Sequence, residues 1–306
     1  MCPKKKKPFY LCISTQKGGV GKSTLTLLAA SYLYYRCGIN LLIVDCDGQH
    51  SLVQIQNRDK ETITKNRFLS EKLKESLLDK ETGKMRKVYP IYPSTISKAV
   101  SFAEKKVALY AEEGIPIDVV LFDFPGSATE EGIVDSLFEM DAIFIPVETD
   151  LMVVEACIDY IMILAEGMEK HQIPLEERPQ IYTFWNRMDG RQQKLRLYYQ
   201  AFLNEVAQQE FQGLITLTAL SVSIGLYARF RRELSSPEVK ALLNKKPEDF
   251  AVFRSSFFPY DEREEEGTGL KHLMEALRMS ISRETPEKIR TEIIEAQEKE
   301  RKFYLS

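Results

Sequence analysis

A glycine-rich segment between an apolar run and a helical pattern constrains this chain more than any other feature. Residues 9–14 are rich in strand formers, and residues 23–36 place apolar side chains at helical spacing. A glycine-rich turn between a strand and a helix lets several backbone N–H groups face one anion, and the helix adds the positive end of its dipole. We therefore expect a phosphate-binding loop here. It consists of Lys17, Gly18, Gly19, Val20, Gly21, Lys22, Ser23 and Thr24.

Two side chains at the start of the expected helix complete this phosphate site. Lys22 would lie against the β- and γ-phosphates of a nucleoside triphosphate, and the Ser23 hydroxyl would bind Mg2+. The alternative is a tight turn without a ligand. Gly-Lys-Ser at a helix start is much more specific than a glycine-rich turn alone, so we favour the phosphate site.

Strands and helices alternate after this loop, which predicts an α/β fold: a mostly parallel twisted sheet with helices on both faces, as in P-loop NTPases. Further strands are expected at residues 40–45, 118–123, 142–147, 180–186 and 214–220. Helices are expected near residues 68–78, 97–113, 129–138, 153–170, 192–211, 269–282 and 286–302. Asp45, Asp123 and Asn186 fall at the carboxyl ends of strands, where such folds bind ligands.

The segment from Lys17 to Ser23 resembles the deviant Walker A motif of ParA/MinD-type ATPases, which have an additional lysine at the start of the loop. The resemblance implies that the chain binds ATP with Mg2+, hydrolyses it, and forms a homodimer with ATP. It also implies that Lys17 reaches the phosphates of the other subunit's ATP. A lysine without a role is the alternative.

Two acids close the strand at residues 40–45, and the segment from Asp45 to Gln49 is similar to the family's Asp-x-Asp-Pro-Gln segment. By this resemblance Asp47 positions the attacking water and acts with Lys17 and Lys22 in catalysis. Asp45 would lie near Mg2+. Gly48 replaces the family's proline, which makes the rigidity of this loop an open question.

Asp123 ends a hydrophobic strand, as the acid of a Walker B element does, and would hold Mg2+ through water. The alternative is a buried acid that caps the next helix. Gly126 stands where the family usually has a second proline, which suggests a looser loop. Asn186 lies where the family places an asparagine that binds the adenine edge. The run to Asp189 also half resembles a GTPase signature, but Arg187 replaces its lysine, so we favour adenine.

The net charge of -3 argues against a protein coated with positive charge, so any contact with nucleic acid must be regional. The candidate basic residues either contact DNA phosphates or form solvated helix faces. They are Arg187, Arg191, Lys194, Arg196, Arg229, Arg231 and Arg232. The Lys4–Lys7 run either contacts DNA or acidic lipid or forms a solvated tail, and we favour the tail. The five cysteines lack Cys-x-x-Cys spacing and are read as packing thiols.

No apolar window of about 18 residues is present, and a cytoplasmic location is expected. We expect one ATPase domain at residues 1–282 and a charged helical tail at residues 283–306. The tail is interpreted as a docked or partner-binding helix, because a membrane-targeting helix would show a larger apolar face.

The resemblance favours a ParA-like switch protein in plasmid partition or conjugative transfer, with nonspecific DNA and a protein activator of hydrolysis as partners. One alternative is a MinD-like ATPase that cycles on membranes, which the tail disfavours. Another is an ATP-binding assembly factor that hydrolyses ATP weakly, which Gly48 and Gly126 make plausible. An iron-protein reductase is disfavoured because paired cluster cysteines are absent.

Overall fold

The computed structural model describes most of the chain and divides it into two compact units. The described residues are 7–78, 83–126, 132–225, 230, 232–245, 252, 254–260 and 268–305. The first unit comprises Met1–Tyr10, Ser23–Asp123 and Ala228–Asp261, and the second comprises Leu11–Lys22, Phe124–Tyr227 and Glu262–Ser306.

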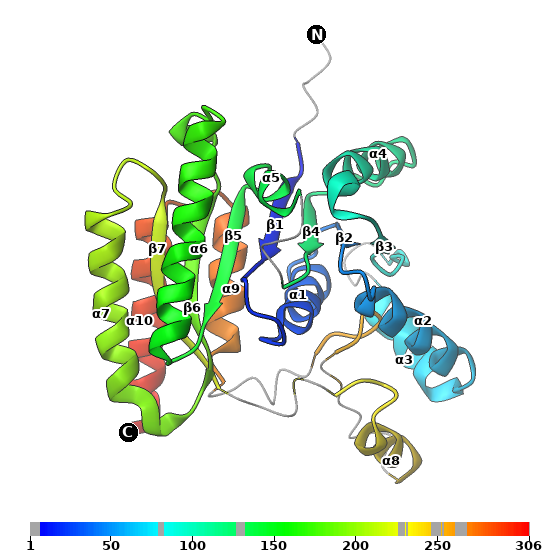
Figure 1. Cartoon of the computed structure of the whole chain (residues 1–306). Coiled ribbons are helices and arrows are strands. Elements are labelled where there is room, and N and C mark those ends of the chain that lie inside the picture. Colours follow the sequence, from blue (N-terminus) through cyan, green and yellow to red (C-terminus); the bar gives the residue numbers. More distant parts are fainter. Residues whose placement is uncertain are drawn as a thin grey trace. The chain divides into compact units, whose positions relative to one another are not determined.

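Seven strands form one sheet in the order β3-β2-β4-β1-β5-β6-β7 (Figure 1). They are β1 (Phe9–Ile13), β2 (Leu41–Asp45), β3 (Ile91–Pro93), β4 (Val119–Asp123), β5 (Ala142–Val147), β6 (Gln180–Met188) and β7 (Leu217–Gly225). In the first unit β2 pairs in parallel with β3 and β4, and in the second unit β1, β5, β6 and β7 pair in parallel. The expected parallel α/β fold is confirmed.

The first unit holds one more helix in its polar region than the sequence suggested. Its helices are α1 (Lys22–Ser31), α2 (Ser51–Thr64), α3 (Arg67–Leu77), α4 (Ala99–Glu112) and α8 (Pro237–Lys245). Helix α1 begins on the last residue of the second unit and continues into a π-helical turn at Tyr32–Arg36. A 3-10 turn at Ile96–Lys98 precedes α4. We expected one helix near residues 68–78, and α2 precedes it. The Asn66 side chain accepts a hydrogen bond from Leu69 N at 3.1 Å and so caps α3. Neither β3 nor α8 was expected.

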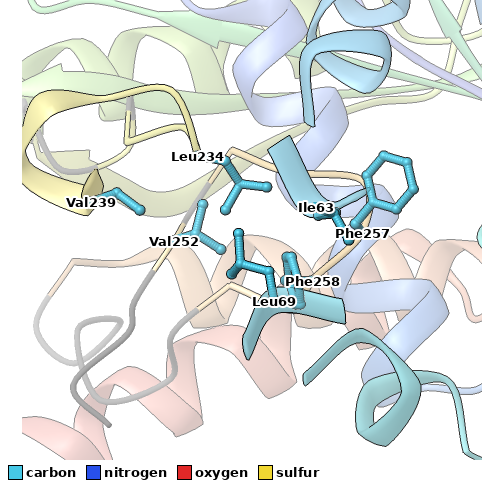
Figure 2. Packing of buried hydrophobic residues seen from close by; sticks show 7 residues of the cluster. All are labelled: Ile63, Leu69, Leu234, Val239, Val252, Phe257 and Phe258. Carbon is cyan, nitrogen blue, oxygen red and sulfur yellow. The ribbon is translucent and has the colours of Figure 1, made fainter. Parts of the chain in front are cut away.

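A separate apolar cluster connects α2 and α3 to the segment that includes α8. Ile63 and Leu69, from α2 and α3, pack against side chains that follow them by more than 160 positions (Figure 2). These partners are Leu234, Val239, Val252, Phe257 and Phe258. The apolar residues of this late segment therefore belong to a long-range core, and among these partners only Val239 lies on a helix, α8.

The second unit places its helices around β5, β6 and β7. They are α5 (Ile133–Phe138), α6 (Leu151–Lys170), α7 (Gln193–Gln209), α9 (Leu270–Ile281) and α10 (Pro286–Leu305), with 3-10 turns at Leu175–Glu177 and Gly190–Gln192. The Asp150 side chain accepts a hydrogen bond from Val153 N at 3.3 Å and so caps α6. The first residues of the helix expected at 129–138 lie outside the described residues.

The charged helix α10 packs on α9 and β7. Its Ile289 and Ile293 are buried, and the Ser221 hydroxyl lies 2.7 Å from Gln297 Oε1. His272 Nε2 on α9 lies 3.3 Å from Glu300 Oε2. The tail was expected to be either a docked helix or a partner-binding helix. In the structure α10 is docked on α9 and β7 of its own chain. Among the residues the structure describes, no helix has the length and apolar character needed to cross a membrane.

Candidate nucleotide-binding site

The loop between β1 and α1 has the curl that phosphate binding needs. Gly19 and Gly21 have φ angles of +74° and +94°, a region that side chains other than glycine rarely adopt. At the start of the loop, Ser14 N donates to Phe144 O at 3.0 Å, and the Ser14 and Tyr160 hydroxyls lie 2.7 Å apart in the core. These two contacts fix the start of the loop against β5 and α6.

Lys22 lies at the first position of α1 and is buried, with 7% of its surface exposed. A methyl group at Gly126 would come within 2.7 Å of Lys22 Nζ and 2.9 Å of Gly18 Cα. The segment after β4 therefore approaches the loop so closely that only glycine fits. The rest of the loop that we expected to be looser, residues 127–131, lies outside the described residues. Ser23 and Thr24 are half-buried, and Val20 is buried.

Asn186, expected to bind an adenine edge, contacts the phosphate loop in this structure. Its Nδ2 donates to Val20 O at 2.7 Å, and the side chain is buried. Its neighbour Arg187 has a positive φ of 55° and donates from Nη2 to Gly19 O. The end of β6 thus supports two consecutive carbonyl groups of the loop.

Glu148, at the end of β5, links two cations beside this loop. Its Oε2 lies 3.1 Å from Lys17 Nζ, and its Oε1 lies 3.4 Å from Arg187 Nη1. Glu148 was not among the site residues expected from the sequence. Its position directly after a buried strand, at the edge where the phosphate loop begins, was the available signal.

The basic residues proposed for DNA differ in exposure. Arg196 is buried and donates to Ser221 O at 3.3 Å, so it is not the solvent-facing cation that we expected. Arg191 is paired with Asp189 at 2.6 Å, and Lys194 is exposed. Arg229 and Arg231 lie outside the described residues, as do Lys4 to Lys6.

Asp45 and Asp123 are register partners on adjacent strands of the first unit, and both are fully buried. Asp45 Oδ2 accepts hydrogen bonds from Leu52 N at 3.0 Å and Val53 N at 3.2 Å, so it caps the start of α2. Burial raises the pKa of the Asp45 carboxyl, and the hydrogen bonds from α2 partly oppose this shift. Asp45 therefore performs the capping role that we had considered as an alternative for Asp123.

The second oxygen of Asp45 is suited to a cation. Asp45 Oδ1 is buried and accepts no hydrogen bond from the described residues, and His50 Nδ1 lies 4.0 Å away. Magnesium prefers oxygen ligands, and the carboxylates of Asp45 and Asp123 with the Ser23 hydroxyl are of that kind. The donor set therefore fits Mg2+.

Asp47 lies in a tight turn after β2. Its Oδ1 accepts a hydrogen bond from Gln49 N at 2.9 Å, and its carbonyl accepts one from His50 N at 2.8 Å. The side chain is half-buried, and His50 has a left-handed φ of 45°. These bonds order the turn although Gly48 replaces a proline.

Comparison with known proteins assigns the family. Residues 11–200 match the model of the CobQ/CobB/MinD/ParA nucleotide binding domain. No curated protein matches the chain. A putative plasmid partition protein from Borrelia burgdorferi, solved with AMPPNP, is 19% identical over 77% of this chain and 94% of its own, with a TM-score of 0.44. A ParA family ATPase from Chlorobium tepidum is 16% identical over 82% and 98%, with a TM-score of 0.45.

A further similar structure is the MinC:MinD cell division complex of Aquifex aeolicus, 18% identical over 77% of this chain and 85% of its own, with a TM-score of 0.38. The family model spans more than half of the 306 residues. The protein therefore belongs to the CobQ/CobB/MinD/ParA nucleotide-binding family.

Proposed function

We propose that the protein is a Mg2+-dependent ATPase that forms a homodimer with ATP and acts as a nucleotide switch. The observation that carries this proposal is the loop before α1, where two glycines have left-handed backbone angles and Lys22 is buried at the first helical position. A curled backbone at a helix start, with a fixed ammonium beside it, suits a triphosphate.

The proposed phosphate ligands are the loop residues Gly18, Gly19, Val20, Gly21, Lys22, Ser23 and Thr24. Asn186 would bind the base from the end of β6, and its bond to Val20 O would couple the base position to the loop. Ser23, Asp45 and Asp123 would hold Mg2+, which when bound neutralises charge on the phosphates. The buried Asp45 Oδ1 supports this set, because it accepts no hydrogen bond from the described residues.

Asp47 and Lys17 are the proposed catalytic partners of Lys22. Asp47 would hold the attacking water, since its Oδ1 is oriented by Gln49 N and its side chain is only half-buried. Lys17 would act on the ATP of the second subunit. Its ammonium is half-exposed and is paired with Glu148, a surface ion pair that exchanges at low cost.

The biological role that we propose, plasmid partition or conjugative transfer with nonspecific DNA and a protein activator, rests on the family resemblance. Calorimetric titration of the wild-type protein with ATP and with ADP, each with Mg2+, tests nucleotide binding first. DNA retention and vesicle flotation, each with ATP and with ADP, then distinguish a DNA switch from a membrane switch. Absence of ATP binding would refute the whole proposal, and flotation without DNA retention would refute the DNA role.

A further inference from the structure

The outer face of α7 carries an apolar stripe that the proposed function does not use. Leu195, Tyr198 and Phe202 are 40%, 69% and 38% exposed. Twelve large hydrophobic residues are exposed among those the structure describes, and these three share one side of α7. Isolated exposed apolar residues are ordinary, whereas a contiguous group on one helix indicates a contact surface.

Hydrogen bonds on the opposite face fix the orientation of this helix. Trp185 Nε1 on β6 donates to Gln200 Oε1 at 2.6 Å, and Gln200 Nε2 donates to Ala219 O on β7 at 3.0 Å. Arg196 adds its bond to Ser221 O, and Leu203 of the same helix is buried. The helix runs along β7 in the second unit (Figure 1). Because the inner face is anchored, the stripe is held in one orientation before any partner arrives.

Two opposite charges lie on the same face at the two ends of the stripe. At about 100° per residue, Lys194 and Glu205 share the helix face of Tyr198. They are separated along the axis by roughly 16 Å, from the rise of about 1.5 Å per residue. Lys194 makes no ion pair within the described part of the chain, and Glu205 accepts a hydrogen bond from Gln209 Nε2 at 3.1 Å.

This arrangement is self-complementary in one orientation only. If two α7 helices run antiparallel about a two-fold axis, Lys194 of each copy meets Glu205 of the other, at both ends of the contact. Tyr198 and Phe202 then pack against the same pair of the second copy. A parallel pair would place like charges opposite each other, which is unfavourable.

We propose that α7 is an interface between two copies of this chain, paired antiparallel through Leu195, Tyr198 and Phe202 and flanked by Lys194–Glu205 ion pairs. This contact needs no nucleotide, because no residue of the phosphate loop takes part. An acidic lipid surface is a poorer occupant, because Glu205 offsets the attraction of Lys194 and the described residues of this face include no basic cluster. One helix per copy buries less than the roughly 1,200 Å² of a standard interface, so we expect weak association, in the micromolar range or above.

Sedimentation velocity of the nucleotide-free protein over a concentration series tests this interface. The wild type should show reversible dimerisation, and Tyr198→Glu should raise the dissociation constant by about tenfold or more, because it places a charge in the apolar centre. Leu109→Glu is the matched control, since Leu109 on α4 is 51% exposed and lies outside the stripe. Calorimetric ATP titration of Tyr198→Glu should give wild-type affinity, which separates this interface from the proposed ATPase function.

A charge exchange tests the antiparallel orientation. Lys194→Glu and Glu205→Lys should each weaken the dimer, and the double variant should restore it, because each copy then presents the opposite pair. A wild type that remains monomeric at every concentration overturns the proposal. So does a dimer equally strong in Tyr198→Glu, or a double variant weaker than both single ones. Flotation of nucleotide-free protein with phosphatidylglycerol vesicles, lost in Tyr198→Glu while the wild type stays monomeric, would assign the stripe to lipid.

Discussion

Lys17 Nζ lies 3.1 Å from Glu148 Oε2, so the lysine that we propose to act on a second subunit is paired within its own chain. Their side chains are 52% and 22% exposed, which makes the pair partly screened by solvent. If Lys17 engages the partner's phosphates, this ion pair must separate first. On the proposed function, the pair would oppose dimerisation by a small amount.

Replacing Glu148 by Gln should strengthen the ATP-dependent dimer. The amide keeps the shape of the side chain and loses the charge that holds Lys17. Exposed ion pairs contribute about 0.2–1 kcal/mol, so we expect an increase of up to about fivefold in dimer affinity. Sedimentation with ATP in an Asp47→Ala background measures it. Glu155→Gln, on the exposed face of α6, should leave the affinity unchanged. A weaker dimer in Glu148→Gln would contradict this view.

Changing Lys17 to Gln should spare ATP binding by the monomer and remove the ATP-dependent dimer. The ammonium is needed only after two loaded subunits meet, where water is excluded and the attraction is little screened. Sedimentation of Lys17→Gln in the Asp47→Ala background, with and without ATP, measures the dimer. Titration with ATP checks that the loop still binds. An ATP dimer of undiminished strength would exclude the action of Lys17 across subunits.

Replacing Asp47 by Ala should leave ATP bound and slow hydrolysis by about 100-fold or more, the usual contribution of a positioned general base. The phosphate contacts survive, while the water loses its acceptor. A phosphate-release assay at saturating ATP reports the rate. Asp159→Ala, an exposed acid on α6, is the control. Hydrolysis at the wild-type rate in Asp47→Ala would show that another group positions the attacking water.

The sequence predicted six of the seven strands, and the central ones, such as β5, were found because they are nearly continuous apolar runs. Strand β5 lies at its expected bounds, whereas β7 (Leu217–Gly225) starts and ends later than the expected 214–220 and alternates buried with half-buried residues in its second half. Helix α2 was missed. Its buried apolar residues Leu52, Ile55 and Ile63 are diluted by polar positions, and its start is stabilised by Asp45 and the left-handed His50. A cap supplied by the end of the preceding strand is a tertiary interaction, which helix periodicity alone does not reveal.

The loop and the strand-end polar residues followed from local spacing, whereas their contacts did not. Lys17 and Glu148 are 131 positions apart, and Asn186 reaches Val20 across 166. No local pattern links such residues. The burial of Arg196 was also not evident, because a basic residue in a polar helix usually faces solvent.

Removing the Lys22 ammonium by Lys22→Ala should weaken ATP binding by about 10- to 100-fold, the loss expected for charge-assisted hydrogen bonds worth about 1.5–3 kcal/mol. The triphosphate would lose its closest fixed positive charge. Calorimetric titration with ATP and Mg2+ measures the change. Lys240→Ala, an exposed lysine on α8, controls for general loss of charge. Equal affinities in Lys22→Ala and wild type would rule out the phosphate site.

Replacing Asp59 by Asn should remove a pH dependence of stability. Asp59 on α2 is buried and accepts a hydrogen bond from the Ser255 hydroxyl at 2.6 Å. Burial raises its pKa to about 7; the Ser255 bond opposes this shift, as do Arg58 and Arg254, whereas Glu233 adds to it. The folded protein therefore holds a proton that the unfolded chain releases near pH 4.

Between about pH 4 and pH 7 this extra proton makes the free energy of unfolding fall by about 1.4 kcal/mol per pH unit as pH rises. Above the pKa of Asp59 in the folded protein, the carboxylate is charged in both the folded and the unfolded state. The free energy of unfolding then falls no further on account of this group. Asparagine keeps the acceptor for Ser255 and does not titrate. Urea unfolding at pH 5, 6, 7 and 8 should therefore show Asp59→Asn close to wild type at pH 5 and progressively more stable than wild type toward pH 8. A difference that stays constant across this range would show that Asp59 is already ionised in the folded protein at pH 5.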